Sequence, residues 1–459
     1  MAMKYRSTRG GIESVSFKEA VMMGLASDGG LLVPETIPNV QPKLDQWAGL
    51  DYPALAAQVM LPFVGDINES VFTELVHRSY QSFDHPQVAP LVPVGDIKVL
   101  ELFHGPTLAF KDIALQFLGE VFSHILAERK ETLNILGATS GDTGSAAIAG
   151  VRGKPGIRIF VMFPEGRTSP IQERQMTTVL DDNVFNLSID GSFDDCQNLL
   201  KSVFNDLPFK QELALGAVNS VNWARVLAQV VYYFWTWYQL GQPKRFDVSV
   251  PTGNFGNIFA GFVAKRMGLP LNRLVLATNE NDILARFFDS GVYQRGAVHF
   301  TQSPAMDIQV ASNFERYLFY QFSEDAKATA EFMQGFQANA EAKLKNPTGY
   351  FDWFVADAVS DDEALGSIAD MYQHYQYLSD PHTAVGCFLA NKYRDPDVPM
   401  VALATAHPAK FESAVEQALP ETANTHPILS ALTGLPTRKI PMLRDPEAVK
   451  GFIRQHCSS

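Results

Sequence analysis

Lys111 is the residue whose type and surroundings suggest chemistry most directly. It follows the apolar run 108–110 and begins the segment 111–119, whose apolar positions indicate a helix. A lysine among apolar side chains and beside the positive end of a helix dipole loses its proton more easily, as the amine of a Schiff base must. The ordinary alternative is a lysine whose ammonium group lies in water, since lysine is almost never fully buried without a partner.

The segment 251–257, PTGNFGN, has the composition of a loop that binds a phosphate group. Gly253 and Gly256 allow backbone N–H groups to approach an anion closely, and Asn254 and Asn257 add further donors. A predicted helix follows the loop, so the positive end of its dipole would also face the anion. The segment matches neither the Walker A pattern nor GxGxxG, which favours a small phosphorylated cofactor over a nucleotide.

A second loop, TSGDTG at 139–144, combines glycine with more hydroxyl groups. Asp142 would repel an anion, so we expect it to face elsewhere or to accept a proton-bearing group of a cofactor. The remaining positions suit the carboxylate of an amino acid, and they are Thr139, Ser140, Gly141 and Thr143.

Arg225 begins a very apolar predicted helix at 223–240, after the capping-type residue Asn222. Its guanidinium could pair with a carboxylate or extend to water, or it could clamp a phosphate or carboxylate of a substrate. His104 is more simply a buried histidine with satisfied partners than an acid or base near a cofactor. The histidines lack HExxH-like spacing, so no metal site is expected.

The elements that must position these residues alternate between strands and helices. Apolar runs indicate buried strands at 132–138, 157–164, 246–250, 273–278 and 398–404. Such alternation predicts the α/β class with doubly wound, mostly parallel sheets, whose ligands bind beyond the carboxyl ends of the strands. Each loop alone could be a tight turn that needs glycine. Three loops with hydroxyl or amide side chains, counting 405–411, favour a binding site.

The chain is too long for one ordinary core and is expected to form three domains. Residues 1–95 show the apolar spacing of helices and carry no evident chemistry. Residues 96–215 would form a smaller α/β domain with Lys111 and the loop 139–144. Residues 216–459 would form a larger α/β domain with the phosphate loop.

Composition limits the classes of function. Of 459 residues, 46% are hydrophobic and 19% charged, as in a soluble globular enzyme. The net charge of −13 argues against a nucleic-acid or anionic-membrane partner. The run 223–240 is interrupted by Arg225 and Gln229 and is expected to be a buried helix rather than a membrane span. Three scattered cysteines and the lack of a signal peptide suit the cytoplasm.

Six longer motifs carry a resemblance. They are FHGPTLAFKD (103–112), ATSGDTGSAA (138–147), PTGNFGN (251–257), SPAMDIQVASNFER (303–316), DPHTAVG (380–386) and TAHPAKF (405–411). Together they resemble the threonine synthase family, in its longer type with an added N-terminal domain. The lysine motif and a glycine loop alone would mark only the broader fold-type II pyridoxal-phosphate enzymes. The motifs at 303–316 and 380–386 are long enough to favour the narrower family.

The resemblance implies roles for the matching positions. Lys111 would hold pyridoxal 5′-phosphate as a Schiff base, and Thr405 would offer its hydroxyl to the pyridine nitrogen. Asp142 stands where sulfhydrylase-like relatives carry Asn against the cofactor's 3′-oxygen, and its contact stays open. The cofactor phosphate would be held by Gly253, Asn254, Phe255, Gly256 and Asn257. The candidate substrate-binding residues are Thr139, Ser140, Gly141, Thr143, Arg225, Asn222 and His104.

The implied reaction converts O-phosphohomoserine and water to L-threonine and phosphate. Lys111 would serve as acid and base, and Arg225 would serve the second anion site that the substrate phosphate requires. Alternatives with the same cofactor are a threonine or serine dehydratase, a β-replacement enzyme and a phospho-lyase that yields a keto acid. A non-catalytic phosphate-binding or nucleotide-binding module is the alternative from another class. The protein is expected to be a cytoplasmic monomer or homodimer.

Overall fold

The computed structural model describes residues 2–457, and the first part of the chain is mostly helical. Its elements are β1 (Tyr5–Ser7), α1 (Phe17–Met23), β2 (Leu32–Pro34), η1 (Gln41–Trp47), α2 (Tyr52–Met60), η2 (Leu61–Phe63) and α3 (Glu69–Tyr80). Ser16, Asp51 and Asn68 begin the three α-helices by accepting backbone N–H groups of the first turn. The predicted helical character is confirmed. The region also shares one buried apolar cluster with helices farther along the chain.

The smaller sheet has five strands in the order β15-β7-β6-β5-β8, all paired in parallel. The strands are β5 (Leu133–Ala138), β6 (Ile157–Pro164), β7 (Val184–Ile189), β8 (Leu215–Gly216) and β15 (Ile440–Met442). The helices of this region are α4 (Lys111–Arg129), α5 (Asp142–Val151), α6 (Pro170–Thr177), α7 (Phe193–Asn205), α8 (Leu207–Glu212) and α18 (Pro446–Cys457).

The larger sheet has six strands in the order β13-β10-β9-β14-β4-β3, parallel except for the pairing of β3 with β4. Its strands are β3 (Leu91–Val94), β4 (Ile97–Glu101), β9 (Phe246–Pro251), β10 (Leu271–Thr278), β13 (Phe354–Ala358) and β14 (Met400–Ala404). Its longer helices are α9 (Trp223–Gln239), α10 (Gly256–Arg266), α13 (Ala326–Asn339), α14 (Asp361–Tyr375) and α15 (Pro381–Tyr393). The remaining elements are α11 (Ile283–Ser290), β11 (Val292–Gln294), η3 (Pro304–Met306), α12 (Phe314–Gln321), β12 (Glu341–Lys343), η4 (Phe351–Trp353), η5 (Pro408–Lys410), α16 (Glu412–Ala418) and α17 (Pro427–Ser430).

Alternating side chains of β10 show that helices cover both faces of the larger sheet. Leu274 and Leu276 belong to the apolar cluster that contains α9 and α10. Val275 and Ala277 belong to a second cluster, with α14 and α15. Because successive residues of a strand point to opposite faces, the sheet is buried on both sides. The α/β fold with mostly parallel sheets is confirmed.

Two strands correct the predicted domain boundaries. β4, which the boundaries place in the smaller domain 96–215, pairs with β14 of the larger sheet. β15, which they place in the larger domain 216–459, pairs with β7 of the smaller sheet. Parallel strands are joined by long crossovers, so the order of segments along the chain does not reveal which strands become neighbours.

The apolar helix α9 is a buried core element, as predicted. Its residues from Trp223 to Trp237 are all buried, including Arg225 and Gln229. Within residues 2–457, no helix is both long and apolar enough to cross a membrane.

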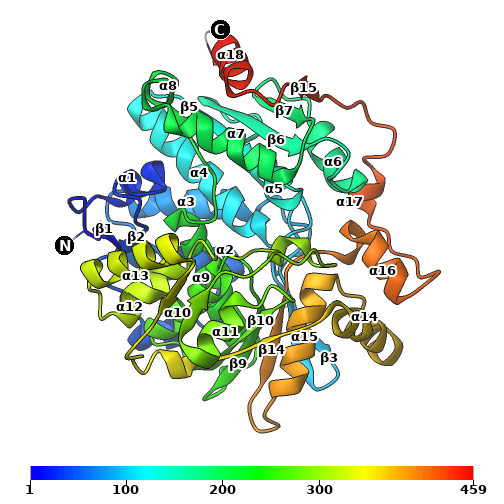
Figure 1. Ribbon diagram of the computed structural model, residues 1–459. Helices are drawn as coiled ribbons and strands as arrows, with labels where there is room; N and C mark the ends of the chain where they lie inside the picture. The colour runs from blue at the N-terminus through cyan, green and yellow to red at the C-terminus, as the bar shows by residue number, and fades with distance from the viewer. Residues whose placement is uncertain (1, 458–459) are drawn as a thin grey trace.

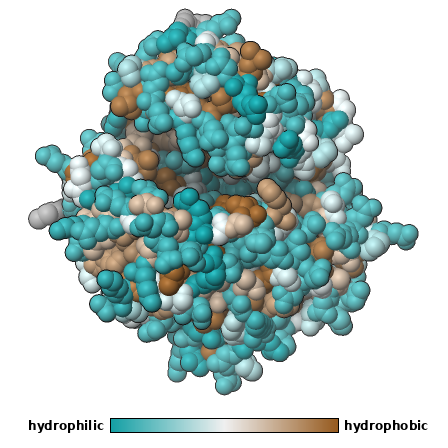
Figure 2. Space-filling view, viewed as in Figure 1, coloured by the Kyte–Doolittle hydropathy of each residue, from teal (hydrophilic) through white to brown (hydrophobic). Residues whose placement is uncertain are grey.

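The two sheets lie on opposite sides of a hollow in the molecular surface. In Figure 1 the smaller sheet lies above the larger one, and α9 and α10 lie in the lower part. Figure 2 shows the same face hollowed between these upper and lower parts. The chain before α4 meets the chain after β14 in an isolated bridge between Ala109 and Ala406. This contact brings loops from both sheets to one place.

Candidate active site

Lys111 begins α4, as predicted, and the segment before it is fastened to the loop after β14. Ala109 pairs with Ala406, and the backbone N–H of Phe110 donates to Thr405 O at 2.8 Å. The side chain of Lys111 is only 14% exposed. The predicted desolvation of this lysine is confirmed, and its backbone is anchored where the two sheets meet.

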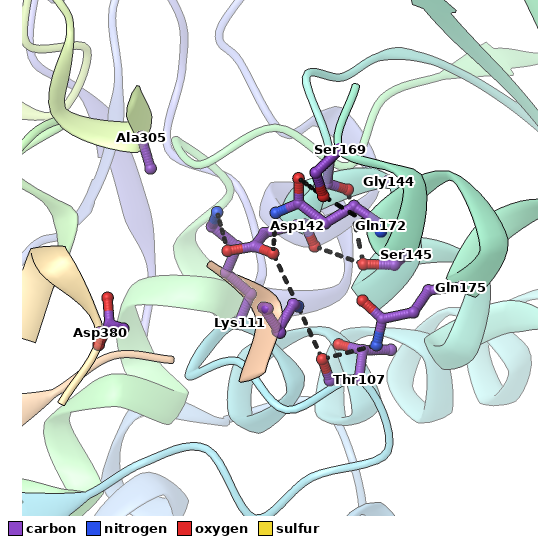
Figure 3. Close-up of polar contacts among 12 residues, drawn as sticks. Thr107, Lys111, Asp142, Gly144, Ser145, Ser169, Gln172, Gln175, Ala305 and Asp380 are labelled. Carbon is purple, nitrogen blue, oxygen red and sulfur yellow. Dashed lines mark hydrogen bonds and ion pairs between the residues drawn. The ribbon is translucent and has the colours of Figure 1, made fainter. Parts of the chain in front are cut away.

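Asp142 lies beside Lys111 at the start of α5 (Figure 3). Its Oδ2 atom is 3.9 Å from Lys111 Nζ, which is longer than a hydrogen bond. Its Oδ1 atom accepts from Lys410 Nζ at 2.7 Å and from Gln172 Nε2 at 2.8 Å. Among the described residues, Asp142 is therefore a carboxylate shared between two lysines and an amide, and its contact with a cofactor stays a prediction.

The surroundings lower the pKa values of both Lys111 and Asp142. Burial is the largest cause that lowers the pKa of Lys111, and Asp142 acts in the opposite direction. The charges of Lys410 and Arg225 lower this pKa further. Burial alone would raise the pKa of Asp142, but the charges of Lys410 and Lys111 hold it well below its ordinary value.

The loop 139–144 is organised around the hydroxyl of Thr139. Thr139 Oγ1 accepts from Gly141 N at 3.0 Å and from Gly144 N at 2.9 Å. A Cβ atom added at Gly141 would lie 2.4 Å from Gln172 Oε1. The φ of 154° at Gly141 is the stronger reason for glycine at this position, because the end of the Gln172 side chain can move away.

The polar residues of the loop 139–144 differ in their exposure to solvent. Thr139 is buried and its hydroxyl serves the loop itself, so its side chain has a shaping role. Ser140 is exposed and Thr143 is partly exposed. No side chain caps the N-terminus of α5. An anion at the loop would therefore meet these two hydroxyls and the positive end of a helix dipole.

The loop after β9 is held by the segment 303–316 through neutral groups. Asn254 O accepts from Asn313 N at 3.0 Å and from Asn313 Nδ2 at 3.2 Å. Ser312 Oγ donates to Asn254 Oδ1 at 3.1 Å. A Cβ atom at Gly253 would lie 2.9 Å from the backbone oxygen of Ala305, so this glycine permits a close backbone approach.

The end of the same loop presents a donor that lacks a protein acceptor. Asn257 Oδ1 accepts from the hydroxyls of Tyr232 and Tyr233 at 2.6 and 3.1 Å. Asn257 Nδ2 is buried, and nothing among the described residues accepts its hydrogens. Phe255 precedes α10 with a left-handed φ of 64°, and no side chain caps this helix. The orphaned amide and the uncapped helix end fit a bound phosphate group.

Thr405 has a free hydroxyl in a constrained backbone. Its N–H donates to Thr383 Oγ1 at 3.1 Å, and within residues 2–457 no hydrogen bond involves its own Oγ1. Thr383 Oγ1 donates to Asp380, whose Oδ1 is also 2.8 Å from His382 Nδ1. His382 Nε2 accepts from Ala305 N at 3.2 Å. The motif 380–386 thus links Thr405 to the segment that packs on Gly253.

Arg225 is a buried cation without a carboxylate partner in the described part of the chain. Its Nη1 donates to Val218 O at 2.9 Å, and its Nε is buried with no acceptor. Burial lowers its pKa to about 10. Only 4% of the surface of Arg225 is exposed, so its side chain does not extend to water. The geometry therefore favours the interpretation of Arg225 as an anion clamp over an ion pair.

Asn222 is engaged in structural bonds, which corrects its assignment to the substrate. Its Oδ1 accepts from Ala224 N at 3.0 Å, and its Nδ2 donates to Val21 O at 2.9 Å. Both polar atoms are used, and the residue is fully buried. Asn222 therefore caps α9 and ties it to α1, as a capping-type residue should.

His104 is likewise satisfied within the protein. Its Nδ1 is 3.2 Å from Asp84 Oδ1, and its Nε2 is 2.8 Å from Glu101 Oε2. The expected partners are present, but His104 is only partly buried, with 19% of its side chain exposed, and its place at the substrate stays a prediction. In residues 2–457, no group of three or more histidine, cysteine or acidic residues could hold a metal ion.

Arg316 is a buried arginine whose role in holding the site together could not be inferred from the sequence. Its Nε and Nη2 donate to Leu32 O at 3.0 and 2.9 Å, and Nη2 also donates to Val221 O at 2.6 Å. Its Nη1 donates to Asn313 Oδ1 at 2.5 Å. Asn313 Nδ2 also donates to Ser220 O at 3.2 Å. One guanidinium thus joins β2 to both the phosphate loop and the start of α9.

The chain matches three family profiles along its length. "Threonine synthase N terminus" matches residues 4–80, "Pyridoxal-phosphate dependent enzyme" matches residues 90–398, and "Threonine synthase, C-terminal" matches residues 383–453. The chain is 47% identical to the threonine synthase of Pseudomonas aeruginosa, over 99% of this chain and 98% of that protein. Its structure matches that of pyridoxal-phosphate-bound threonine synthase from Brucella melitensis with a TM-score of 0.96, at 44% identity over 100% of both chains. It is also 36% identical to the threonine synthase-like 2 protein of Xenopus laevis, over 91% of this chain and 90% of that one.

Proposed function

The chain belongs to the threonine synthase family, and we propose that it converts O-phosphohomoserine and water to L-threonine and phosphate. Pyridoxal 5′-phosphate is the cofactor of this fold. The single observation that carries the assignment of roles is the largely buried Lys111, whose pKa burial lowers, in the direction that the amine of a Schiff base requires.

The residues of the site fit the cofactor. Asn257 Nδ2 is an unpaired buried donor, and the loop before it has a glycine that allows close backbone approach. These groups, with Asn254, Phe255 and Gly256, would hold the cofactor phosphate. Thr405 Oγ1 would face the pyridine nitrogen, and Lys111 Nζ would hold the carbonyl carbon. When bound, the cofactor withdraws electrons from the substrate carbon that bears the amino group.

Two anion sites are assigned to the substrate. Ser140, Thr143 and the backbone around Gly141 at the N-terminus of α5 would bind the α-carboxylate. Arg225 would bind the γ-phosphate, since within residues 2–457 its Nε has no acceptor and its charge no carboxylate partner. A cation at the γ-phosphate stabilises the negative charge that grows as phosphate leaves.

Lys111 moves the protons of the reaction. Its Nζ would accept the proton from the substrate α-carbon, to which the bound cofactor would give acidity, and would deliver protons to later positions. Departure of the γ-phosphate precedes addition of water at the β-carbon. The low exposure of Lys111 limits competing proton exchange with bulk water.

The test compares the wild type with Lys111→Ala and with Lys392→Ala, a half-exposed lysine that pairs with Asp357. Wild type and Lys392→Ala should release phosphate and form threonine from O-phosphohomoserine. Lys111→Ala should lose turnover and the cofactor absorbance that borohydride removes. Full activity of Lys111→Ala would reject the role of this lysine. Formation of a keto acid in place of threonine would favour a phospho-lyase, and release of no phosphate would favour a dehydratase or β-replacement enzyme.

We place the enzyme in the cytoplasm as a monomer or homodimer, without nucleic-acid or membrane partners. The free cysteines Cys196 and Cys387 are buried, which suits a reducing compartment. Light scattering of the purified chain would decide between the two oligomeric states, and a larger assembly would overturn this assignment.

A further inference from the structure

We propose that Lys410 is a positioning residue that neutralises Asp142 and thereby removes the counter-charge that would hold the nearby Lys111 as an ammonium. This inference rests on the proposed function, because it explains how the amine that holds the cofactor stays reactive. Lys410 belongs to the motif 405–411, and sequence analysis assigned it no role.

The geometry gives Lys410 the closer hold on Asp142. The side chain of Lys410 is 0% exposed, and its Nζ atom is 2.7 Å from Asp142 Oδ1. Lys111 Nζ lies 3.9 Å from the other oxygen, Oδ2. A charge-assisted hydrogen bond at the shorter distance outweighs a contact beyond hydrogen-bond range. One negative charge is thus matched by one lysine, and a second ammonium at Lys111 would lack a counter-charge.

Backbone and amide contacts fix Lys410 in this place. Its Nζ also donates to Thr107 O at 2.7 Å, and Gln175 Nε2 donates to the same oxygen at 3.0 Å. Gln172 adds a hydrogen bond to Asp142 from the same helix, α6. The ammonium of Lys410 therefore has two acceptors, which a buried cation needs in order to stay charged.

The groups that face Lys111 come from four elements. Asp142 on α5 favours its charged form, and Lys410 on η5 opposes it. Arg225 on α9 opposes the charged form from farther away, and Asp112 on α4 favours it weakly. Asp112 accepts two hydrogen bonds from Thr107, and burial raises its pKa to about 6. Among the charged neighbours, the balance at Lys111 therefore depends mainly on whether Lys410 occupies Asp142.

Removal of Lys410 and removal of Asp142 should shift the pKa of Lys111 in opposite directions. In Lys410→Met, Asp142 loses its nearer cation and stabilises an ammonium at Lys111 instead, so the pKa of Lys111 rises. In Asp142→Asn, the charge of Lys410 is unopposed, so the pKa of Lys111 falls. A general disturbance of the fold would not produce two opposite shifts.

The experiment measures the titration of Lys111 itself. Full-length protein freed of cofactor is labelled with trinitrobenzenesulfonate at a series of pH values, and mass spectrometry quantifies the Lys111 peptide. Lys410→Met should raise the pH midpoint of labelling by about one unit or more, Asp142→Asn should lower it, and the double variant should lie between them. Lys392→Met, which removes an exposed ion-paired lysine, should leave the midpoint unchanged.

The outcomes separate this inference from the proposed function. An unchanged midpoint in Lys410→Met, or shifts of the same sign in both single variants, would overturn the inference. If Lys410→Met does not fold, Lys410→Arg retains the charge and should keep the wild-type midpoint, and Asp142→Asn alone must still lower it. Opposite shifts in a chain that forms no threonine would retain the inference and reject the proposed function. Threonine formation by the wild type, with the same labelling midpoint in all variants, would reject the inference and retain the proposed function.

Discussion

The two glycine loops of the site are similar in composition but are held by different kinds of interaction. The loop 139–144 is held from outside by charged and amide side chains, since Asp142 contacts Lys410 and Gln172. The loop after β9 is held by neutral hydrogen bonds from Asn313 and by packing around its buried aromatic residue. Both lie between a strand and a helix whose N-terminus no side chain caps.

The difference teaches how each loop can serve its ligand. Charged contacts in a buried site are strong and depend on protonation, so they suit the side where a proton must move. Neutral hydrogen bonds between amides and the backbone do not titrate, so they suit the side that retains the cofactor phosphate. We therefore expect damage to the loop after β9 to affect cofactor affinity, and damage to the loop 139–144 to affect substrate use.

Among the variants that test the difference between the two loops, Gly253→Ala is expected to have the largest effect. Its new Cβ would lie 2.9 Å from the backbone oxygen of Ala305, and backbone yields less readily than a side chain. Overpacking of about 1–3 kcal/mol predicts a loss of cofactor affinity of about fivefold to 150-fold. Equilibrium titration of cofactor-free protein with pyridoxal phosphate measures this loss.

Gly141→Ala is the matched variant on the other loop. Its Cβ meets the side chain of Gln172, which can move away but then gives up its hydrogen bond to Asp142. We expect a higher KM for O-phosphohomoserine and a smaller loss of cofactor affinity than in Gly253→Ala. Equal losses of cofactor affinity in both variants would abolish the proposed distinction between the loops.

Arg225→Met should give the next largest effect. The guanidinium would make charge-assisted hydrogen bonds to the substrate phosphate, worth about 1.5–3 kcal/mol, so KM should rise about tenfold to a hundredfold. Methionine keeps most of the apolar packing around α9. Steady-state kinetics and cofactor titration measure the two effects separately, with Arg394→Met, an exposed arginine paired with Asp96, as the control. Unchanged kinetics would return Arg225 to a structural role.

The sequence revealed those parts of the site whose chemistry is local. Lys111 at a helix start, both glycine loops and the parallel sheets followed from short-range patterns and from motif resemblance. Lys410 could not be recognised in this way, because its meaning depends on Asp142, which lies far away along the chain. The sheets to which β4 and β15 belong escaped prediction for the same reason.

Local patterns also assigned function to atoms that the fold uses elsewhere. The polar atoms of Asn222 bond to Val21 and Ala224. Those of His104 lie within hydrogen-bond distance of Asp84 and Glu101. A sequence shows that a donor exists and does not show whether a distant backbone group has already claimed it. Conversely, the unpaired Nδ2 of Asn257 became visible only with its surroundings.

Asn313→Ala tests the neutral side of the comparison with a moderate effect. The substitution removes the amide that bonds to Asn254 O and Ser220 O, and it deprives Arg316 of an acceptor. With about 1 kcal/mol for each of the two lost neutral bonds, cofactor affinity should fall about thirtyfold. The affinity loss should be the same at pH 6.5 and pH 7.5, because the bonds to Asn254 and Ser220 are neutral and both pH values lie below the pKa of Arg316, which burial lowers to about 9. A loss that varies strongly between those pH values would contradict the neutral character assigned to this loop.

The smallest expected effect comes from Thr143, which tests whether the loop 139–144 contacts the substrate through side chains or only through backbone. Thr143 is partly exposed, and no described residue bonds to its hydroxyl, whereas the hydroxyl of Thr139 is consumed by the loop. Thr143→Ala should raise KM about fivefold, as expected for one lost hydrogen bond of about 1 kcal/mol, and Thr143→Ser should restore it. Cofactor affinity should stay at the wild-type value in both variants. If Thr143→Ala has wild-type KM, the carboxylate is bound by the backbone N–H groups of α5 alone, and the two loops then differ only in how they are held.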